Sequence, residues 1–295
     1  MTYLPILRLI FPVLVNGSIF VLYEYPDSGL MIRARIGDRA EHGLFQFDTT
    51  SRGTVIEQSF SVDDARPNSI TILPGDWEVE PFVLRELPGH SFIPSMLEGF
   101  GGMLGAGLGS IFANTVSSIM IVPSHSSPGP LHLILSPASP QDQCIERSIT
   151  RIPAQYSDDL GVMTVGISVS LIFAQTGLSY VGNTPTVMEQ FIVSTTHRFD
   201  YVPRDIARHL GDIVTSFRGT SSTCTHIMDL LPSIQYTISG RVSVVLSAQD
   251  YLTESCELKI GASRGGQNIL GINFLKHVAV LIDYTTHQFG FCDPI

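Results

Sequence analysis

The stretch Leu44-Phe-Gln-Phe-Asp-Thr-Thr-Ser51 joins an apolar, strand-like run to a turn of polar residues and threonines. A similar stretch recurs in the second half of the chain as Leu171-Ile-Phe-Ala-Gln-Thr-Gly-Leu178. Each is followed downstream by an apolar pair closed by glycine, in Gly102-Met-Leu-Gly105 and in Ile269-Leu-Gly271. Two copies of one pair of motifs indicate two duplicated lobes.

The composition favours a mainly β chain of about two domains. The 295 residues are 44% hydrophobic and only 15% charged, and their apolar runs are short and end at Gly, Pro, Asp or Ser. Strands are expected at 20–25, 30–36, 43–47 and 53–59. Helices are expected at 186–193 and 203–210, where a proline lies near each predicted start. The Pro- and Ser-rich residues 136–143, followed by 145–153, predict a crossover between the lobes.

Charge and residue spacing exclude several classes of function. The net charge is −10 and no Lys/Arg cluster occurs, which argues against a nucleic-acid partner. No Cys or His spacing fits a metal site, and the glycines of 99–109 do not fit a dinucleotide loop, so no metal and no cofactor are expected. Residues 99–141 contain no charge apart from two histidines, but their glycines and prolines favour a buried strand and loop over a membrane helix.

The first residues leave two interpretations open. Residues 4–15 are apolar and fit either the core of a signal peptide or a first buried strand, and they precede the glycosylation pattern Asn16-Gly17-Ser18. The four cysteines suit two disulfides outside the cytosol. We therefore expect a secreted protein or one in the lumen of the secretory pathway.

Several further motifs resemble those of the pepsin family of aspartic peptidases. Residues 172–192 are similar to the second catalytic turn of that family, and 230–240 to a segment that a disulfide closes into a hairpin. The closing strands of the family resemble 269–290, which end in Asp283-Tyr and Phe289-Gly290.

The resemblance implies a mainly β, bilobal fold in which two related, β-barrel-like lobes and a few short helices surround a cleft. An N-terminal lobe of 18–143 would carry the turn Asp48-Thr49-Thr50, and a C-terminal lobe of 144–295 the turn Gln175-Thr176-Gly177. Residues 1–17 would be the signal peptide or first strand. The resemblance also implies a Cys224–Cys256 disulfide, which leaves Cys144 and Cys292 as a second pair between the crossover and the C-terminal strand.

The catalytic chemistry of that family requires two carboxylates that share one proton. Asp48 occupies the first position, whereas the resemblance assigns the second to Gln175, whose amide neither ionises nor transfers a proton near neutral pH. Thr50 stands where the family has glycine, while Thr176 and Gly177 are retained. The hairpin that covers substrate in the family would lie at 69–77, where Trp77 is the candidate cleft residue and tyrosine is absent.

Three functions are compatible with these residues. The first is a non-catalytic homologue that binds a peptide or protein through the cleft or the outer surface. The second is a residual aspartic endopeptidase in which Asp48 works alone or with another carboxylate, such as Asp283 or one from a second chain. The third is a structural subunit of a larger assembly, which the low charge and the apolar middle segment would suit.

Overall fold

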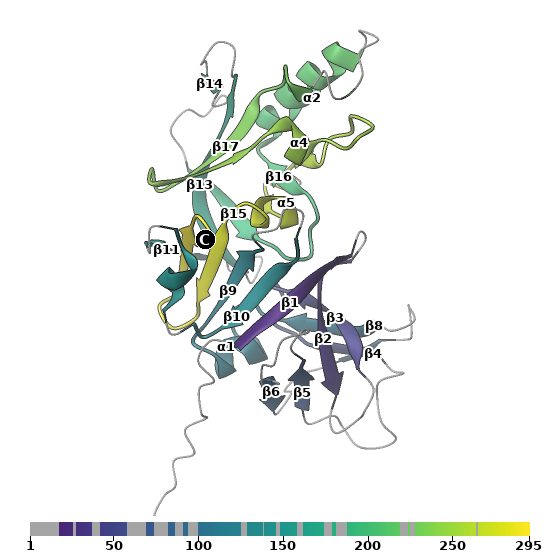
Figure 1. Ribbon diagram of the computed structural model, residues 1–295, viewed down its shortest axis with the longest axis vertical. Coiled ribbons are helices and arrows are strands. Elements are labelled where there is room, and N and C mark those ends of the chain that lie inside the picture. Colours follow the sequence, from purple (N-terminus) through teal and green to yellow (C-terminus); the bar gives the residue numbers. More distant parts are fainter. Residues whose placement is uncertain are drawn as a thin grey trace, which may run out of the picture.

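The computed structural model describes residues 18–25, 28–36, 42–57, 69–73, 82–85, 91–93, 100–124, 129–137, 139–145, 148–157, 162–173, 179–180, 188–218, 224, 228–263 and 265–295. Residues 1–17 lie outside these ranges, so both interpretations of 4–15 stay predictions. Two β-sheets dominate the described part, which confirms the mainly β class (Figure 1).

The larger sheet has 13 strands, and its main path runs β11-β22-β21-β9-β10-β1-β2-β3-β8-β4-β7. Its strands from the first half of the chain are β1 Ser18–Tyr25, β2 Gly29–Ile36, β3 Gly43–Asp48, β4 Val55–Glu57, β5 Ser69–Ile72, β6 Phe82–Arg85, β7 Ser91–Ile93, β8 Phe100–Gly105, β9 Ser118–Pro123 and β10 Leu131–Leu135. The second half adds β11 Thr150–Pro153, β21 Ala279–Asp283 and β22 Gln288–Cys292. Strands from both sides of the lobe boundary predicted after residue 143 therefore belong to the larger sheet.

The smaller sheet has nine strands, and its main path runs β18-β17-β13-β15-β20-β16-β19. Its members are β12 Gln155–Ser157, β13 Val162–Ile172, β14 Ser179–Tyr180, β15 Glu189–Val193, β16 Asp200–Val202, β17 Ser233–Ile238, β18 Val242–Leu246, β19 Ile260–Ala262 and β20 Asn268–Leu270. The helices are α1 Ile111–Thr115, the 3-10 helix η2 Pro140–Gln143, α2 Arg204–Arg218, α4 Ala248–Tyr251 and α5 Ile272–Leu275. Among the described helices none is long and apolar enough to cross a membrane.

One predicted helix is confirmed and the other is wrong. Ile206, Leu210 and Val214 recur every four residues and are buried on one face of α2, so the helix predicted at 203–210 exists and continues to Arg218. In the range 186–193, residues 189–193 instead form β15. The buried Phe191-Ile-Val193 favours a strand between β13 and β20 over the local start signal of Pro185.

Two parallel strand pairs, one from each sheet, frame the candidate site. In the larger sheet β3 runs parallel to β8, with Asp48 opposite Gly105. In the smaller sheet β15 runs parallel to β20, with Val193 opposite Leu270. The buried strand predicted within 99–109 is therefore β8. The apolar pairs closed by glycine lie at the ends of β8 and β20, at Gly105 and Gly271.

The glycines at the ends of these apolar pairs, Gly105 and Gly271, are required because a side chain would collide with a neighbouring backbone. A Cβ atom on Gly105 would lie 2.6 Å from the carbonyl oxygen of Ser51, and one on Gly271 would lie 2.6 Å from that of His197. Real Cβ atoms do not approach backbone oxygens so closely. Gly105 thus lets the loop after β3 pass directly over the end of β8, and Gly271 lets the loop after β15 pass directly over the end of β20.

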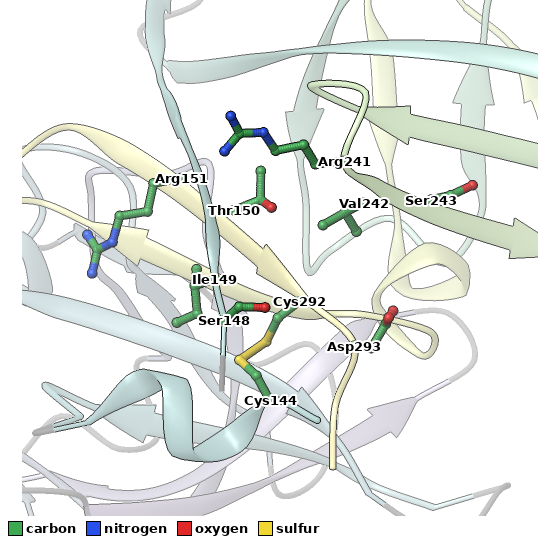
Figure 2. A pocket seen from close by; sticks show the side chains of 10 residues that line it. All are labelled: Cys144, Ser148, Ile149, Thr150, Arg151, Arg241, Val242, Ser243, Cys292 and Asp293. Carbon is green, nitrogen blue, oxygen red and sulfur yellow. A yellow bond between two sulfur atoms is a disulfide. The ribbon is translucent and has the colours of Figure 1, made fainter. Parts of the chain in front are cut away.

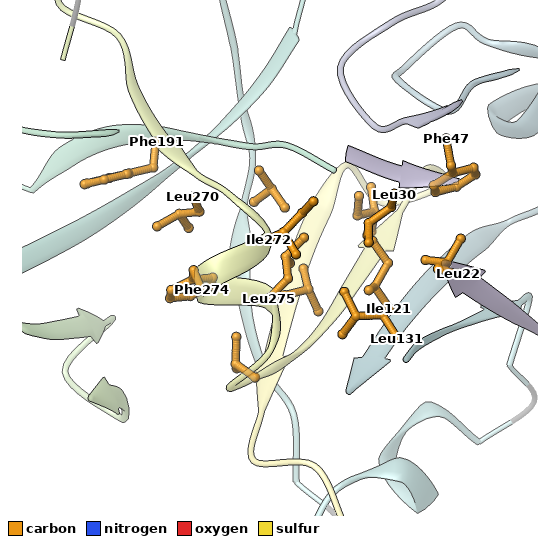
Figure 3. Packing of buried hydrophobic residues seen from close by; sticks show 14 of the residues in the cluster. Leu22, Leu30, Phe47, Ile121, Leu131, Phe191, Leu270, Ile272, Phe274 and Leu275 are labelled. Atoms are coloured by element: carbon orange, nitrogen blue, oxygen red, sulfur yellow. The ribbon is translucent and has the colours of Figure 1, made fainter. Parts of the chain in front are cut away.

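A single apolar cluster connects the two sheets. The short helix α5 contributes Ile272, Phe274 and Leu275, all fully buried. Figure 3 shows these side chains lying between residues of the smaller sheet, such as Phe191, and residues of the larger sheet, such as Leu30. Because the core is continuous, the turns that end β3 and β15 are held in a defined relation to each other.

Candidate functional site

Two turns meet where β3 and β15 end, and we call them the paired turns. The first is Asp48-Thr49-Thr50 and the second is Ser194-Thr195-Thr196. Asp48 and Thr49 are each 8% exposed, while Ser194 and Thr195 are fully buried. Each turn follows an apolar strand whose buried side chains fix its position against the parallel partner strand.

The paired turns are joined by hydrogen bonds with approximate two-fold symmetry. The Thr49 hydroxyl donates to the Val193 carbonyl at 2.8 Å, and the Thr195 hydroxyl donates to the Phe47 carbonyl at 2.5 Å. In return, the Thr49 amide donates to Thr195 Oγ1 at 3.1 Å and the Thr195 amide donates to Thr49 Oγ1 at 3.3 Å. Each threonine therefore satisfies a buried amide and a buried carbonyl of the opposite turn.

The two turns also repeat each other internally. The amide and the hydroxyl of Thr50 donate to Asp48 Oδ1 at 2.8 Å and 2.6 Å. In the second turn the Thr196 amide donates to Ser194 Oγ at 3.4 Å, and the two hydroxyls lie 3.0 Å apart. Ser194 Oγ therefore takes the place of a carboxylate oxygen, so Ser194 is the counterpart of Asp48.

This geometry corrects the position assigned to the second turn. The sequence interpretation placed Gln175, Thr176 and Gly177 opposite Asp48, but these residues lie outside the described ranges and the hydrogen-bonded partner of the first turn is Ser194-Thr195-Thr196. A signal for it exists in the sequence. The stretch Phe191-Ile-Val-Ser-Thr-Thr196 matches Phe45-Gln-Phe-Asp-Thr-Thr50 in its aromatic start and its Thr-Thr end.

His197 follows the second turn and adds an imidazole to the site. Its Nδ1 lies 2.8 Å from Ser194 Oγ, and its ring meets that of Tyr201 edge to face with centroids 5.8 Å apart. Burial lowers the pKa of His197, because desolvation penalises the imidazolium, while the negative charge of Asp48 acts in the opposite direction. The imidazole is therefore neutral at pH 7. It was not among the residues predicted from the sequence.

Among the described residues, the paired turns contain one carboxylate, whereas proton sharing requires two. Among the described residues, the hydrogen bonds to the Asp48 carboxylate come from Thr50, and no second carboxylate is bonded to it. A serine hydroxyl titrates far outside the range in which it could share a proton with an aspartate. Asp283, the alternative second acid, accepts a 2.8 Å salt bridge from Arg151 and the amides of Thr285 and Thr286.

The hairpin expected at 69–77 is present in part. Strands β5 and β6 pair in antiparallel fashion from Ser69 opposite Arg85 to Ile72 opposite Phe82, and β5 also pairs with β2. Trp77 lies outside the described residues, so its role in a cleft stays a prediction. Within the described part of the chain, no group of three or more acidic, His or Cys residues could hold a metal ion.

Both predicted disulfides are confirmed. Cys144 is bonded to Cys292 and Cys224 to Cys256. The first lies beside a pocket of about 380 Å³ between β11, β22 and the turn that joins β17 to β18. Figure 2 shows Arg241 and Thr150 on one side of this pocket and Asp293 on another, while Arg151, bound to Asp283, points away.

Comparison with known proteins finds structural similarity without sequence similarity. No protein-family model and no curated protein matches the sequence. The structure is similar to that of the aspartic proteinase from Irpex lacteus, with a TM-score of 0.67 and 15% identity over 95% of this chain and 98% of that one. It is also similar to basic 7S globulin from soybean, with a TM-score of 0.68 and 10% identity over 94% of both chains. These similarities establish the fold.

Proposed function

Because the chain has the fold of pepsin-like aspartic proteinases but holds Ser194 opposite Asp48, we propose that it is a non-catalytic homologue that binds a peptide or an extended protein segment. The observation that carries the proposal is the buried serine at the position of the second carboxylate. Without a shared proton, no water can be activated in the manner of that fold class. Fold alone does not imply activity, which depends on the groups at the site.

The scaffold around the lost dyad supports binding as the retained role. The four hydrogen bonds between Thr49 and Thr195 and their partner carbonyls keep the paired turns together although the chemistry is gone. Thr50, Thr196 and His197 are partly exposed beside them and offer hydroxyl and imidazole groups to a ligand. The two disulfides fit an oxidising compartment outside the cytosol, so we place the protein in the secretory pathway or outside the cell.

The first test is incubation of the purified protein with a broad peptide library from pH 3 to 7, followed by mass spectrometry of intact and cleaved peptides. We expect retention of a subset of intact peptides and no cleavage. Ser194→Asp should restore measurable cleavage, because it recreates two carboxylates on hydrogen-bonded turns. Gln175→Asp is the matched control and should remain silent, since it adds the same charge outside the paired turns.

Cleavage by the wild-type protein that disappears in Asp48→Ala would instead establish the residual endopeptidase and contradict the proposal. Cleavage by Gln175→Asp but not by Ser194→Asp would contradict the assignment of the second turn. Absence of both cleavage and peptide retention would leave the assembly subunit as the better account.

A further inference from the structure

The carboxylate of Asp48 is largely buried and has no cationic partner among the described residues. It is 8% exposed, and Thr50 supplies both hydrogen bonds to Oδ1. Among the described residues, none donates to Oδ2 and none forms a salt bridge with Asp48. Buried carboxylates are ordinarily paired with a cation or share a proton, because an isolated buried charge is costly. With Ser194 opposite Asp48, the part of the site that the structure describes offers no second carboxyl group with which to share a proton.

The basic side chains beside the paired turns are engaged elsewhere. Arg52 and Arg198 each lie four residues after the first residue of a turn. The guanidinium of Arg52 lies over the ring of Tyr156, 5.2 Å from its centroid. Arg198 lies 3.9 Å from a carboxylate oxygen of Glu24, which also binds the Lys276 ammonium, and over the ring of Phe199. These three cations therefore do not compensate Asp48.

His197 does not supply the missing positive charge at neutral pH. Its Nδ1 is hydrogen-bonded to Ser194, and burial lowers its pKa, which keeps the ring neutral. The groups that face it are the Asp48 carboxylate and the uncharged Tyr201 ring, while Asp200 on the same segment is turned into the core toward the amides of Gly271 and Phe274. Among the described residues of the paired turns and His197, Asp48 therefore carries the one charge, and the Thr50 hydroxyl donates to it.

We propose that Asp48 binds the ammonium or guanidinium group of a lysine or arginine side chain in the bound peptide, with Oδ2 as the acceptor. This inference rests on the proposed function and names the feature of the peptide that the site selects. A charge-assisted hydrogen bond to a buried carboxylate is about twice as strong as a neutral one, so the charge of the ligand contributes directly to affinity. The loss of one aspartate would then have converted a proton-sharing site into a cation-binding site.

The test uses two matched peptide pools with blocked termini and randomised flanks. One pool has lysine at the centre and the other has norleucine, which keeps the aliphatic chain and lacks the charge. Binding of each pool to the full chain is measured by retention at pH 7.5 and low salt. We expect the lysine pool to bind roughly ten-fold more tightly, the gain typical of a hydrogen bond to a charged group.

Two variants locate the source of that preference. Asp48→Asn keeps the size of the side chain and an oxygen for Thr50 but removes the charge, and it should bring the ratio of lysine to norleucine affinity close to one. Asp212→Asn removes the same charge from an exposed position on α2 and should leave the ratio unchanged. Circular dichroism and the unfolding temperature verify that both variants fold.

The possible results separate the inference from the proposed function. Equal retention of both pools by the wild type would overturn the cation site while leaving peptide binding intact. If both variants lost the preference for lysine equally, the preference would be due to the overall charge of −10, and the inference would likewise be overturned. Retention of neither pool would refute peptide binding itself, and the cation site with it.

Discussion

At the scale of single residues, the two turns differ in their first side chain, which is Asp48 in one turn and Ser194 in the other. Both side chains accept from the threonine two residues later, so the local hydrogen-bonding role of the carboxylate survives in the serine. Of the two side chains, that of Asp48 is ionisable near neutral pH, and proton sharing depends on two such groups. Thr49 and Thr195 join the two turns, because each hydroxyl bonds a carbonyl and an amide of the opposite turn.

Thr195→Val should destabilise the protein by about 3 kcal/mol, because it leaves the buried Thr49 amide and Phe47 carbonyl without partners while preserving shape. The measurement is the free energy of unfolding from urea or guanidinium denaturation. Thr237→Val, on a partly exposed position of β17, is the matched control and should change stability little. Equal decreases in the free energy of unfolding of the two variants would mean that the hydrogen bonds between the turns do not stabilise the protein more than those of an ordinary strand position.

At the scale of elements, Asp200 connects β16 to β17 and to the segment from β20 to α5. Its Oδ1 accepts from the Gly271 amide at 2.7 Å and the Phe274 amide at 3.3 Å, and its Oδ2 from the Tyr236 hydroxyl at 3.2 Å. Desolvation raises the pKa of Asp200 to about 7, although these hydrogen bonds act to lower it. The pKa of this buried carboxyl therefore lies near neutral pH.

The sign of the resulting pH dependence follows from the raised pKa. In the unfolded chain Asp200 ionises near pH 3.8, whereas in the folded protein it keeps its proton until about pH 7. Its contribution to stability is therefore complete below pH 3.8 and decreases as the pH rises to 7, by about 4 kcal/mol in total. Asp200→Asn cannot ionise, so its stability relative to the wild type should increase over this interval.

Urea denaturation at pH 4, 6 and 8 measures that change. Asp142→Asn, at an exposed position in η2, accounts for the general effect of losing one carboxylate. Parallel pH profiles for the wild type and Asp200→Asn would show that the buried carboxyl is not the titrating group.

The two helices predicted from the sequence show where a local start signal fails. Residues 203–210 were predicted correctly because the helical period of apolar residues agrees with a proline at the start. Residues 186–193 carry a similar proline signal, but five of them are recruited as the strand β15 between β13 and β20. A short apolar run fits either structure, and its neighbours in the sheet decide between them.

At the scale of the whole molecule, the two disulfides close loops of different size. Cys144 and Cys292 are 148 residues apart and connect the crossover to the last strand, whereas Cys224 and Cys256 are 32 apart within the second half of the chain. Loop-closure entropy predicts a cost of about 5 kcal/mol for losing the first and about 4 kcal/mol for losing the second. Both losses are large against the stability of an ordinary domain.

We therefore expect the Cys144→Ser/Cys292→Ser double variant to be less stable than the Cys224→Ser/Cys256→Ser double variant, measured as free energies of unfolding under non-reducing conditions. The reverse order would show that local strain or residual structure in the unfolded chain outweighs loop length.

The sequence by itself determined the mainly β class, both disulfides and the apolar pairs closed by Gly105 and Gly271. These features are local or repeat in order along the chain: short apolar runs that end at Gly, Pro, Asp or Ser, a glycine after an apolar pair, and cysteines at positions that a known family shares. Asp48 could be identified because Asp-Thr after an apolar strand is informative by itself.

Only the tertiary structure decided which turn faces Asp48. The stretches ending at Gln175 and at Ser194 both follow apolar strands, and the former looks closer to the expected Thr-Gly pattern. The choice depends on which strand lies parallel to β20 and on which threonine reaches the Phe47 carbonyl, and the second of these contacts joins residues 148 positions apart. Pairing between residues so far apart follows from the packing of both sheets, so the local match between 45–50 and 191–196 was not sufficient to single out the second turn.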